Sequence, residues 1–153
     1  MQVSIETIAA KRVAFIRHVG PYQEIGPTFE QLCGWAGAKG LIGPTAEFLC
    51  VGYDDPDTTP ADQIRADAAV TVDETVAGEG DVQIGEIRGG KYAVAIHKGP
   101  YATLIDSYRW LYHQWLPASG HELAEAPCFE RYVNDPQSTP EQELLTAIHI
   151  PLK

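Results

Sequence analysis

One five-residue phrase occurs twice in this chain, and the repeat limits the folds that the chain can adopt. Residues 18–22 read HVGPY, and residues 97–101 read HKGPY. An apolar run comes before each copy, at 13–17 and at 92–96, as expected of a buried strand. The sequence therefore predicts that one strand-to-helix corner is built twice in a duplicated fold.

A helical pattern follows each copy of the phrase at the same offset. Apolar side chains stand at i, i+4, i+7 and i+11 in both halves: Ile25, Phe29, Leu32 and Ala36, then Leu104, Tyr108, Leu111 and Trp115. This spacing puts four side chains on one face of each helix, against one core. Gly40 and Gly120 are placed to end the two helices.

Further segments continue the correspondence beyond the helices. Each half reads as strand, helix, strand, long turn and strand, and residues 1–8 and 81–88 add one strand before each unit. We expect one α+β domain over residues 1–153, made of two repeats at about 1–78 and 79–153. Two pseudo-symmetric units side by side would form a pseudo-two-fold cleft, a common place for a small-molecule site.

The repeated phrase itself is expected to be architectural. A histidine at a strand end, such as His18 or His97, is more often a hydrogen-bonded structural residue than a ligand. Tyr22 and Tyr101, in the first helical turn, are expected to pack rather than to catalyse. Function should therefore lie where the two halves differ.

Composition and charge exclude several classes of function. The chain is 44% hydrophobic and 21% charged, as in ordinary globular proteins, and no apolar run is long enough to span a membrane. The N-terminus MQVSIETIAAKRVAF lacks the features of a secretory signal, so we expect a cytoplasmic protein. The net charge of −10, with no basic stripe to offset it, argues against direct nucleic-acid binding.

Cofactor and metal motifs are missing. Cys33, Cys50 and Cys128 are widely spaced and are expected to be buried free thiols, and His and Cys never cluster at metal-ligand spacing. The chain has neither GxGxxG nor GxxxxGK[ST], and no Ser-His-Asp order indicates acyl-enzyme chemistry. We expect no metal and no cofactor.

The clearest break in the repeat lies in PCFERYVND. In strand alternation Cys128, Glu130 and Tyr132 share one face. The equivalent positions of the first half carry no charge: Phe48, Cys50 and Gly52. A carboxylate in the middle of an interior-looking strand costs desolvation unless something offsets that cost.

Two interpretations of Glu130 remain open. In the first, the carboxylate is paired with Arg131, Arg109 or a backbone donor and has a structural role. In the second, it is an anion on the floor of a pocket, waiting for a cation or a polarisable substrate. Tyr132 would then stand beside it with a phenol and a π-face.

These residues carry a family resemblance over nearly the whole chain. The doubled Gly-Pro-Tyr corner, GYDDPDTTPADQIRADAAVTV at 52–72 and PCFERYVNDPQSTPEQELLTAIHIPL at 127–152 resemble the GyrI-like small-molecule-binding domain. Trp115-Leu116 and Gly120 extend the resemblance. This domain is also the effector-binding half of AraC-type and MerR-type regulators, and the stand-alone DNA gyrase inhibitory proteins are the most similar branch. No residues remain here for the regulators' helix-turn-helix.

The resemblance implies a duplicated β-α-β-β module whose antiparallel strands form a curved sheet with two helices packed on it. It also implies an aromatic-lined pocket between the halves, with a buried Glu that receives cationic, often planar molecules. That Glu maps onto Glu130. Part of the family is associated with hydrolysis of cyclopropane-bearing DNA-alkylating toxins by a Glu and a Tyr.

Three functions follow as alternatives. The first is a drug- or toxin-binding protein that captures small hydrophobic or cationic molecules through Glu130, with stacking on Tyr132, Tyr112, Trp110 or Trp35. The last three lie off the apolar stripes of the two helices.

The second function is a hydrolase in which Glu130, with a raised pKa, holds a water as general base. Tyr132, or failing that Tyr112, would donate to the developing oxyanion. The third is a protein inhibitor of DNA gyrase that acts through its acidic surface. Its partner would be the gyrase, or a regulator protein.

Overall fold

Two units of mixed α and β structure make up the chain, which a computed structural model describes over residues 1–153. Unit 1 contains Met1–Ile8 and Gly90–Lys153, and unit 2 contains Ala9–Gly89. Every strand pairing within the units is antiparallel. The predicted α+β class, with antiparallel sheet and two main helical segments, is confirmed.

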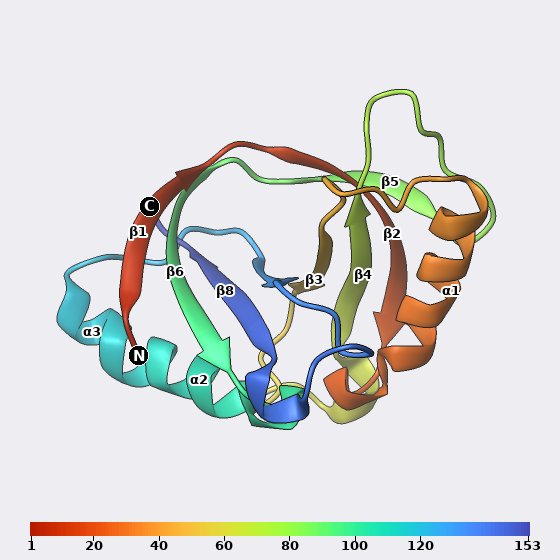
Figure 1. Ribbon diagram of the computed structural model, residues 1–153. Coiled ribbons are helices and arrows are strands. Elements are labelled where there is room, and N and C mark those ends of the chain that lie inside the picture. The colour runs from red at the N-terminus through yellow and green to blue at the C-terminus, as the bar shows by residue number, and fades with distance from the viewer. The chain divides into compact units, whose positions relative to one another are not determined.

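Unit 2 is a four-stranded sheet with one long helix. Its strands run in the order β3-β4-β2-β5. The elements are β2 (Lys11–Val19), η1 (Tyr22–Glu24), α1 (Gly26–Ala38), β3 (Phe48–Gly52), η2 (Ala61–Gln63), β4 (Arg65–Thr71) and β5 (Gln83–Ile87). Helix α1 packs on β2 and β4 (Figure 1).

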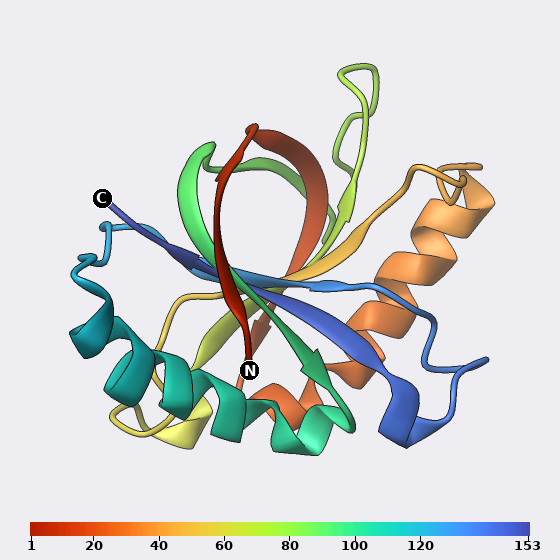
Figure 2. The ribbon, with the colours of Figure 1, turned by 60° about the vertical axis from the view of Figure 1, so that its left-hand side comes forward.

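Unit 1 repeats this plan with the strand order β1-β6-β8-β7. Its elements are β1 (Val3–Ile8), β6 (Gly90–Lys98), η3 (Tyr101–Thr103), α2 (Leu104–Trp110), η4 (Leu111–Trp115), α3 (Leu116–Ser119), β7 (Cys128–Tyr132), η5 (Glu141–Glu143) and β8 (Leu145–Pro151). The segments α2, η4 and α3 form one continuous helical stretch (Figure 2). η4 is a π-helical turn, in which Leu116 N–H donates to the carbonyl of Leu111.

The first strand of each sequence repeat pairs within the sheet of the other repeat. β1 pairs with β6, and β5 pairs with β2. The compact units are therefore offset from the predicted repeats at 1–78 and 79–153. The apolar alternation of residues 1–8 and 81–88 predicts a strand, but it contains no information on the strand's partner.

Both predicted apolar stripes face the cores of their units. Leu32 and Ala36 of α1 are fully buried, with Ile25 and Phe29 packed beside them. In unit 1 the buried members are Leu104 and Leu111, and Tyr108 and Trp115 are partly buried against the same cluster. Small strand residues lie beneath each helix: Ala14 and Ala68 in unit 2, and Ala93 and Ala95 in unit 1.

The repeated phrase builds the same corner twice, as predicted. Gly20 and Gly99 have φ of 137° and 133°, a conformation that favours glycine. In each copy the histidine Nε2 contacts a carbonyl three residues on: His18 that of Pro21 at 2.9 Å, and His97 that of Pro100 at 3.2 Å. The corner is thus held by its own histidine.

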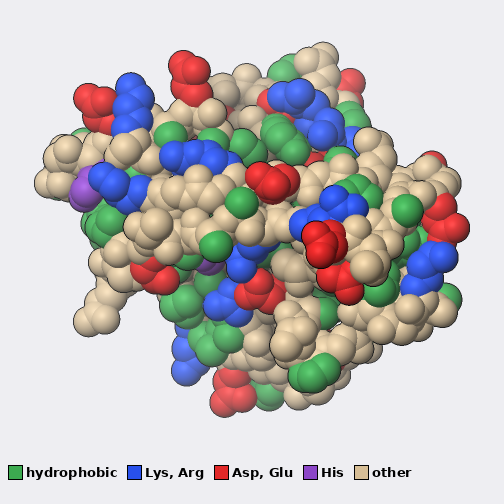
Figure 3. All heavy atoms as spheres, turned by 90° about the horizontal axis from the view of Figure 1, so that it is seen from above, with side chains coloured by type: hydrophobic (Ala, Val, Ile, Leu, Met, Phe, Trp, Pro, Cys, Tyr) green, Lys and Arg blue, Asp and Glu red, His purple; other side chains and the backbone are tan.

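The surface carries charges of both signs. On the face in Figure 3, Lys and Arg side chains lie scattered among Asp and Glu and form no continuous basic stripe. None of the helices is long and apolar enough to cross a membrane.

Candidate functional site

Glu130 lies on β7, on the side of the unit 1 sheet that carries the helices. Its Cα pairs with that of Ile148, a core residue packed under α2. The hydroxyl of Tyr108, from α2, donates to Glu130 Oε1 at 3.0 Å, and the Tyr132 hydroxyl also hydrogen-bonds to the carboxylate. The carboxylate therefore has two phenol donors from two different elements.

No cation offsets the charge of Glu130. Its pKa is raised to about 7 because burial disfavours the charged form more than the hydrogen bonds from Tyr108 and Tyr132 favour it. Arg131 and Arg109, the partners considered from the sequence, form no ion pair with it. Glu130 nevertheless keeps some accessible surface. It is thus strongly desolvated, lacks a counterion and can still be reached.

A third tyrosine belongs to this cluster. The rings of Tyr101 and Tyr132 are 5.3 Å apart and inclined at 59°. Burial, with smaller contributions from the charges of Glu130 and Asp135, raises the pKa of Tyr101. We call Glu130, Tyr101, Tyr108 and Tyr132 the Glu130 cluster.

The two copies of the repeated tyrosine have different surroundings. Tyr22 donates its hydroxyl to the backbone carbonyl of Asp54 at 2.8 Å, a structural contact within unit 2. Tyr101 contacts Tyr132 with its ring, and its hydroxyl has no hydrogen-bond partner. The expectation that Tyr101 packs rather than catalyses stays a prediction.

Tyr112 and Trp35, which were also predicted as ligand-binding residues, lie on elements other than those that carry the Glu130 cluster. Tyr112 is in η4 and packs on the unit 1 core. Trp35 belongs to unit 2, where its indole N–H donates to Glu79 Oε1 at 2.7 Å and Lys39 lies 5.9 Å from its ring. A ligand-binding role for Tyr112 and Trp35 stays a prediction.

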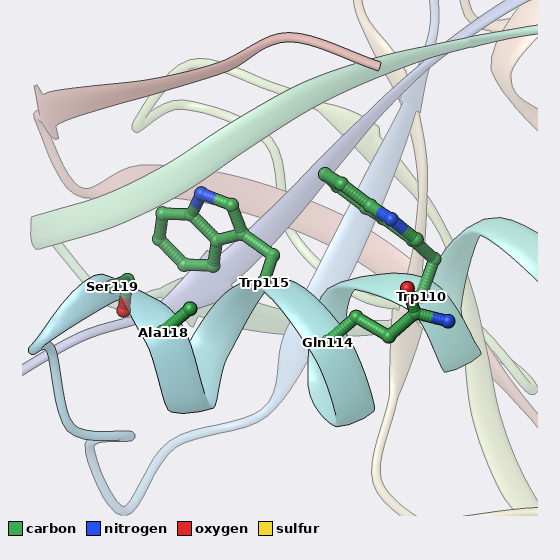
Figure 4. Close-up of a pocket in the computed structure, with 5 residues that line it drawn as sticks. All are labelled: Trp110, Gln114, Trp115, Ala118 and Ser119. Carbon is green, nitrogen blue, oxygen red and sulfur yellow. The ribbon is translucent and has the colours of Figure 1, made fainter.

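Trp110 lines a depression of about 350 Å³ with Gln114, Trp115, Ala118 and Ser119. Figure 4 shows the two indoles rising from the same side of the helical stretch. The intervening π-helical turn changes the angular spacing between Trp110 and Trp115 from that of a regular α-helix. Trp115 also stacks on His121, with ring centroids 6.2 Å apart. A ligand-binding role for Trp110 likewise stays a prediction.

Comparison with known proteins identifies the family. The model of the GyrI-like small-molecule-binding domain matches residues 1–153. The chain belongs to this family. The resemblance that the sequence motifs indicated is therefore confirmed.

The relatives of this GyrI-like chain include stand-alone proteins. The chain is 37% identical to a DNA gyrase inhibitor of Edwardsiella piscicida and 34% identical to one of Edwardsiella ictaluri, covering all of this chain and 99% of each relative. The C-terminal domain of EcmrR has the same fold, with a TM-score of 0.79, 21% identity and coverage of 99% and 97% of the two chains. SAV2435 bound to tetraphenylphosphonium matches with a TM-score of 0.65 and 19% identity, over 100% of this chain and 94% of that one.

Two members of the Glu130 cluster were not predicted as site residues. The sequence places Tyr108 in the core because it lies on the apolar stripe, and it predicts a packing role for Tyr101 because that residue lies in the first helical turn. A tyrosine on a buried stripe is itself a signal, because its hydroxyl needs a polar partner where phenylalanine would need none. Glu130 in the facing strand is that partner.

Neither the cysteines nor the side chains that could bind a metal form a second candidate site. None of the three cysteines forms a disulfide, but only Cys50 is buried; Cys33 and Cys128 are partly exposed, contrary to the expectation. Strand and helix periodicity define a core-facing side and cannot show how completely a side chain there is covered. No group of three or more His, Cys, Asp or Glu side chains could hold a metal ion.

Proposed function

We propose that this GyrI-like chain captures small organic cations at the Glu130 cluster. The observation that carries the proposal is a carboxylate that is desolvated and accessible and has no counterion. Removing a charge from water is costly, and a bound cation would provide the missing electrostatic compensation. Attraction between opposite charges is also stronger in such surroundings than in bulk water.

The tyrosines favour aromatic cations over metal ions. Tyr101 and Tyr132 offer ring faces, on which a cation or a planar ring can lie. A hard metal cation requires several oxygen ligands around it, and the faces of phenol rings do not provide them. The fold match to SAV2435 bound to tetraphenylphosphonium, an organic cation with aromatic rings, supports this ligand class.

The test compares a cation with a neutral molecule of similar shape. Isothermal titration calorimetry would measure binding of tetraphenylphosphonium and of uncharged triphenylphosphine oxide to the wild-type protein and to Glu130→Gln. We expect the variant to bind the cation about 10- to 100-fold more weakly, equivalent to roughly 1–3 kcal/mol for a lost charged interaction. The neutral compound should change by less than about threefold. Equal losses for both compounds would remove the electrostatic role of Glu130.

A hydrolase is the second candidate, and the pKa of about 7 for Glu130 favours it. A carboxylate that titrates near neutral pH suits a general base. In this scheme Glu130 takes a proton from a water molecule while the oxygen of that water forms a bond to a cyclopropane carbon. The strained C–C bond breaks, and its electron pair passes to a conjugated carbonyl oxygen of the substrate. A tyrosine hydroxyl then protonates that oxygen.

Tyr101 is better suited than Tyr132 or Tyr112 to be that donor, because the Tyr132 hydroxyl is already bonded to Glu130 and the Tyr101 hydroxyl is free. A solved protein described as a hydrolase from Listeria innocua shares the fold, with a TM-score of 0.69 and 12% identity over 99% of this chain and 92% of that one. Mass spectrometry should detect the addition of one water to a cyclopropane-bearing substrate. Wild-type activity retained in Glu130→Gln would exclude this chemistry.

Inhibition of DNA gyrase is the third candidate, and the names of the relatives favour it. A supercoiling assay with purified gyrase tests it directly. If the acidic surface acts, Glu130→Gln should inhibit as well as the wild type does. Failure of the wild-type chain to inhibit at a large molar excess would reject a direct action on the enzyme.

A further inference from the structure

A second buried carboxylate lies in unit 2, on the face of the sheet away from α1. Asp67 of β4 is only 2% exposed and pairs in register with Arg17 of β2. Its neighbour Ala68 packs in the core under α1, so strand alternation points Asp67 to the opposite face. Arg17 Nε donates to Asp67 Oδ1, and the hydroxyl of Tyr53 donates to Oδ2, both at 2.5 Å.

Two guanidinium groups lie over the ring of Tyr53. The Cζ of Arg17 is 4.8 Å from the ring centroid, and that of Arg65 is 5.6 Å away. Arg65 is fixed by Asp54, whose two carboxylate oxygens accept from Nε and Nη2 at 3.0 Å. This arrangement holds both arginines in place at the surface, where Tyr53 is 39% exposed.

Arg17 has more hydrogen-bond donors than partners. A guanidinium has five N–H donors, and Arg17 uses Nε on Asp67, with Tyr53 as its one other polar partner. Its side chain is 37% exposed. The remaining donors form a fork of fixed orientation, because the Asp67 contact and the Tyr53 ring hold the group.

The other repeat shows that the fold does not require these charges. Aligning the two corner phrases and the two Asp-Pro turns pairs Arg17 with Ile96, Tyr53 with Val133 and Asp67 with Ala147. Unit 1 therefore forms the same strands with apolar residues at all three positions. A buried ion pair can often be replaced by apolar residues without loss of stability. The cluster in unit 2 thus calls for another explanation than folding.

We propose that the surface formed by Arg17, Val19, Tyr53 and Arg65 docks an acidic peptide segment of a partner protein. An Asp or Glu carboxylate of that segment would accept hydrogen bonds from the unused donors of Arg17. Val19 is 58% exposed and lies across from Arg65, where it offers an apolar contact. Arginine and tyrosine held rigidly at a surface are typical of the centres of protein interfaces.

The charge balance favours a carboxylate over a phosphate. Asp67 lies against Arg17, and Asp54 against Arg65, so the four groups carry no net charge together. A singly charged carboxylate meets less repulsion from the two aspartates than a doubly charged phosphate does. None of these residues belongs to the Glu130 cluster, so the inference is independent of the small-molecule proposal.

The test is an NMR titration of the ¹⁵N-labelled full chain with unlabelled hexaglutamate at physiological salt. We expect the Arg17 Nε–H signal to shift saturably with hexaglutamate and to be unaffected by hexaserine. The triple variant Arg17→Ile/Tyr53→Val/Asp67→Ala carries the residues of unit 1, and it should keep its melting temperature. Its affinity, measured like that of the wild type from the backbone amide shifts of β2 and β4, should fall at least tenfold. Arg12→Gln, on the same strand, is the matched control and should bind as the wild type does.

Several results would overturn the proposal. One is the absence of a saturable shift at Arg17 in the wild type, and another is unchanged affinity in the triple variant. Stronger binding of inorganic phosphate than of hexaglutamate would reject the carboxylate assignment. If the triple variant unfolds, Arg17→Lys provides the affinity comparison, because it keeps a cation beside Asp67 and removes the guanidinium fork. Unchanged affinity in Arg17→Lys would also contradict the proposal.

Discussion

Two phenol donors surround the Glu130 carboxylate, and no cation balances it. A buried carboxylate without a counterion lowers the stability of the folded protein, and it is the group to which we assign cation binding. The ordinary pKa of a glutamate is 4.5, and that of Glu130 is raised to about 7. The folded protein therefore holds this proton to higher pH than the unfolded chain does, and the consequence can be measured.

Glu130→Gln should stabilise the protein at alkaline pH and leave it unchanged at acid pH. Between about pH 4.5 and 7 the unfolded chain gives up the proton first, so the wild-type unfolding free energy falls as the pH rises. At about 1.4 kcal/mol for each pKa unit, the loss is of the order of 3 kcal/mol at most. Urea unfolding at pH 4.5 and pH 8 measures it.

The matched control for that experiment is the exposed Glu141→Gln in η5, which should behave as the wild type does at both pH values. A Glu130→Gln protein that loses several kcal/mol at pH 8 would contradict the account. Glu130 would then be a structural partner of Tyr108 and Tyr132, and the two histidines of the corners would become the better candidates for a site.

At the scale of elements, the two corners share a backbone but differ in how firmly their histidines are held. His18 is partly exposed and has one hydrogen bond, to Pro21. His97 is buried, and beyond Pro100 its Nδ1 contacts Ser107 Oγ at 2.7 Å and its Nε2 contacts Thr103 Oγ1 at 3.1 Å. The second corner is thus tied to α2, which also carries Tyr108.

His97→Ala should therefore destabilise the protein more than His18→Ala. We expect a loss of about 1–2 kcal/mol for His97→Ala, because Ser107 is left buried without its partner, and of about 0.5–1 kcal/mol for His18→Ala. Chemical denaturation of both variants at one pH provides the comparison. Binding of tetraphenylphosphonium by the folded fraction should change little in either. A larger loss for His18→Ala would mean that the two corners are not held as described.

Much of the fold could be predicted from the sequence, because the sequence contains the same pattern of strands, corner and helix in two copies. The corners, the apolar stripes and the strands after them agree with the structure, since hydrophobic period and turn chemistry act locally. The exchange of β1 and β5 between the repeats could not be predicted, because strand pairing is set by tertiary contacts that alternation does not encode. The sequence alone shows that Glu130 has no charged equivalent in the first repeat. The hydroxyl of Tyr108, on an otherwise apolar helix face, could also have indicated that Tyr108 is the hydrogen-bond partner of Glu130.

At the scale of the whole molecule, charge decides which partners are excluded. The chain carries a net charge of −10, and Asp67 and Asp54 lie beside Arg17 and Arg65, where they would repel a phosphate backbone. Binding to nucleic acid requires clustered cations that displace the counterions of the phosphates. The charge of this chain therefore argues against DNA as a direct partner.

Duplex DNA should accordingly show no binding at physiological salt. Fluorescence anisotropy of a labelled duplex, with protein at up to high micromolar concentration, measures this. The same duplex should also remain unbound at low salt, where electrostatic attraction is strongest. A micromolar complex that weakens as salt is added would show that a basic surface is present and would contradict this part of the account.

The pH dependence of cation capture tests the central claim most directly. Isothermal titration calorimetry of tetraphenylphosphonium at pH 5.5, 7 and 8.5 measures whether the ligand binds the ionised form of Glu130. Affinity should rise at least tenfold between pH 5.5 and 8.5 in the wild type and level off above the pKa of about 7, with proton release on binding near neutral pH. Glu130→Gln should bind weakly and equally at all three values. A wild-type affinity that does not vary with pH, or the same rise in the variant, would show that Glu130 does not capture the cation.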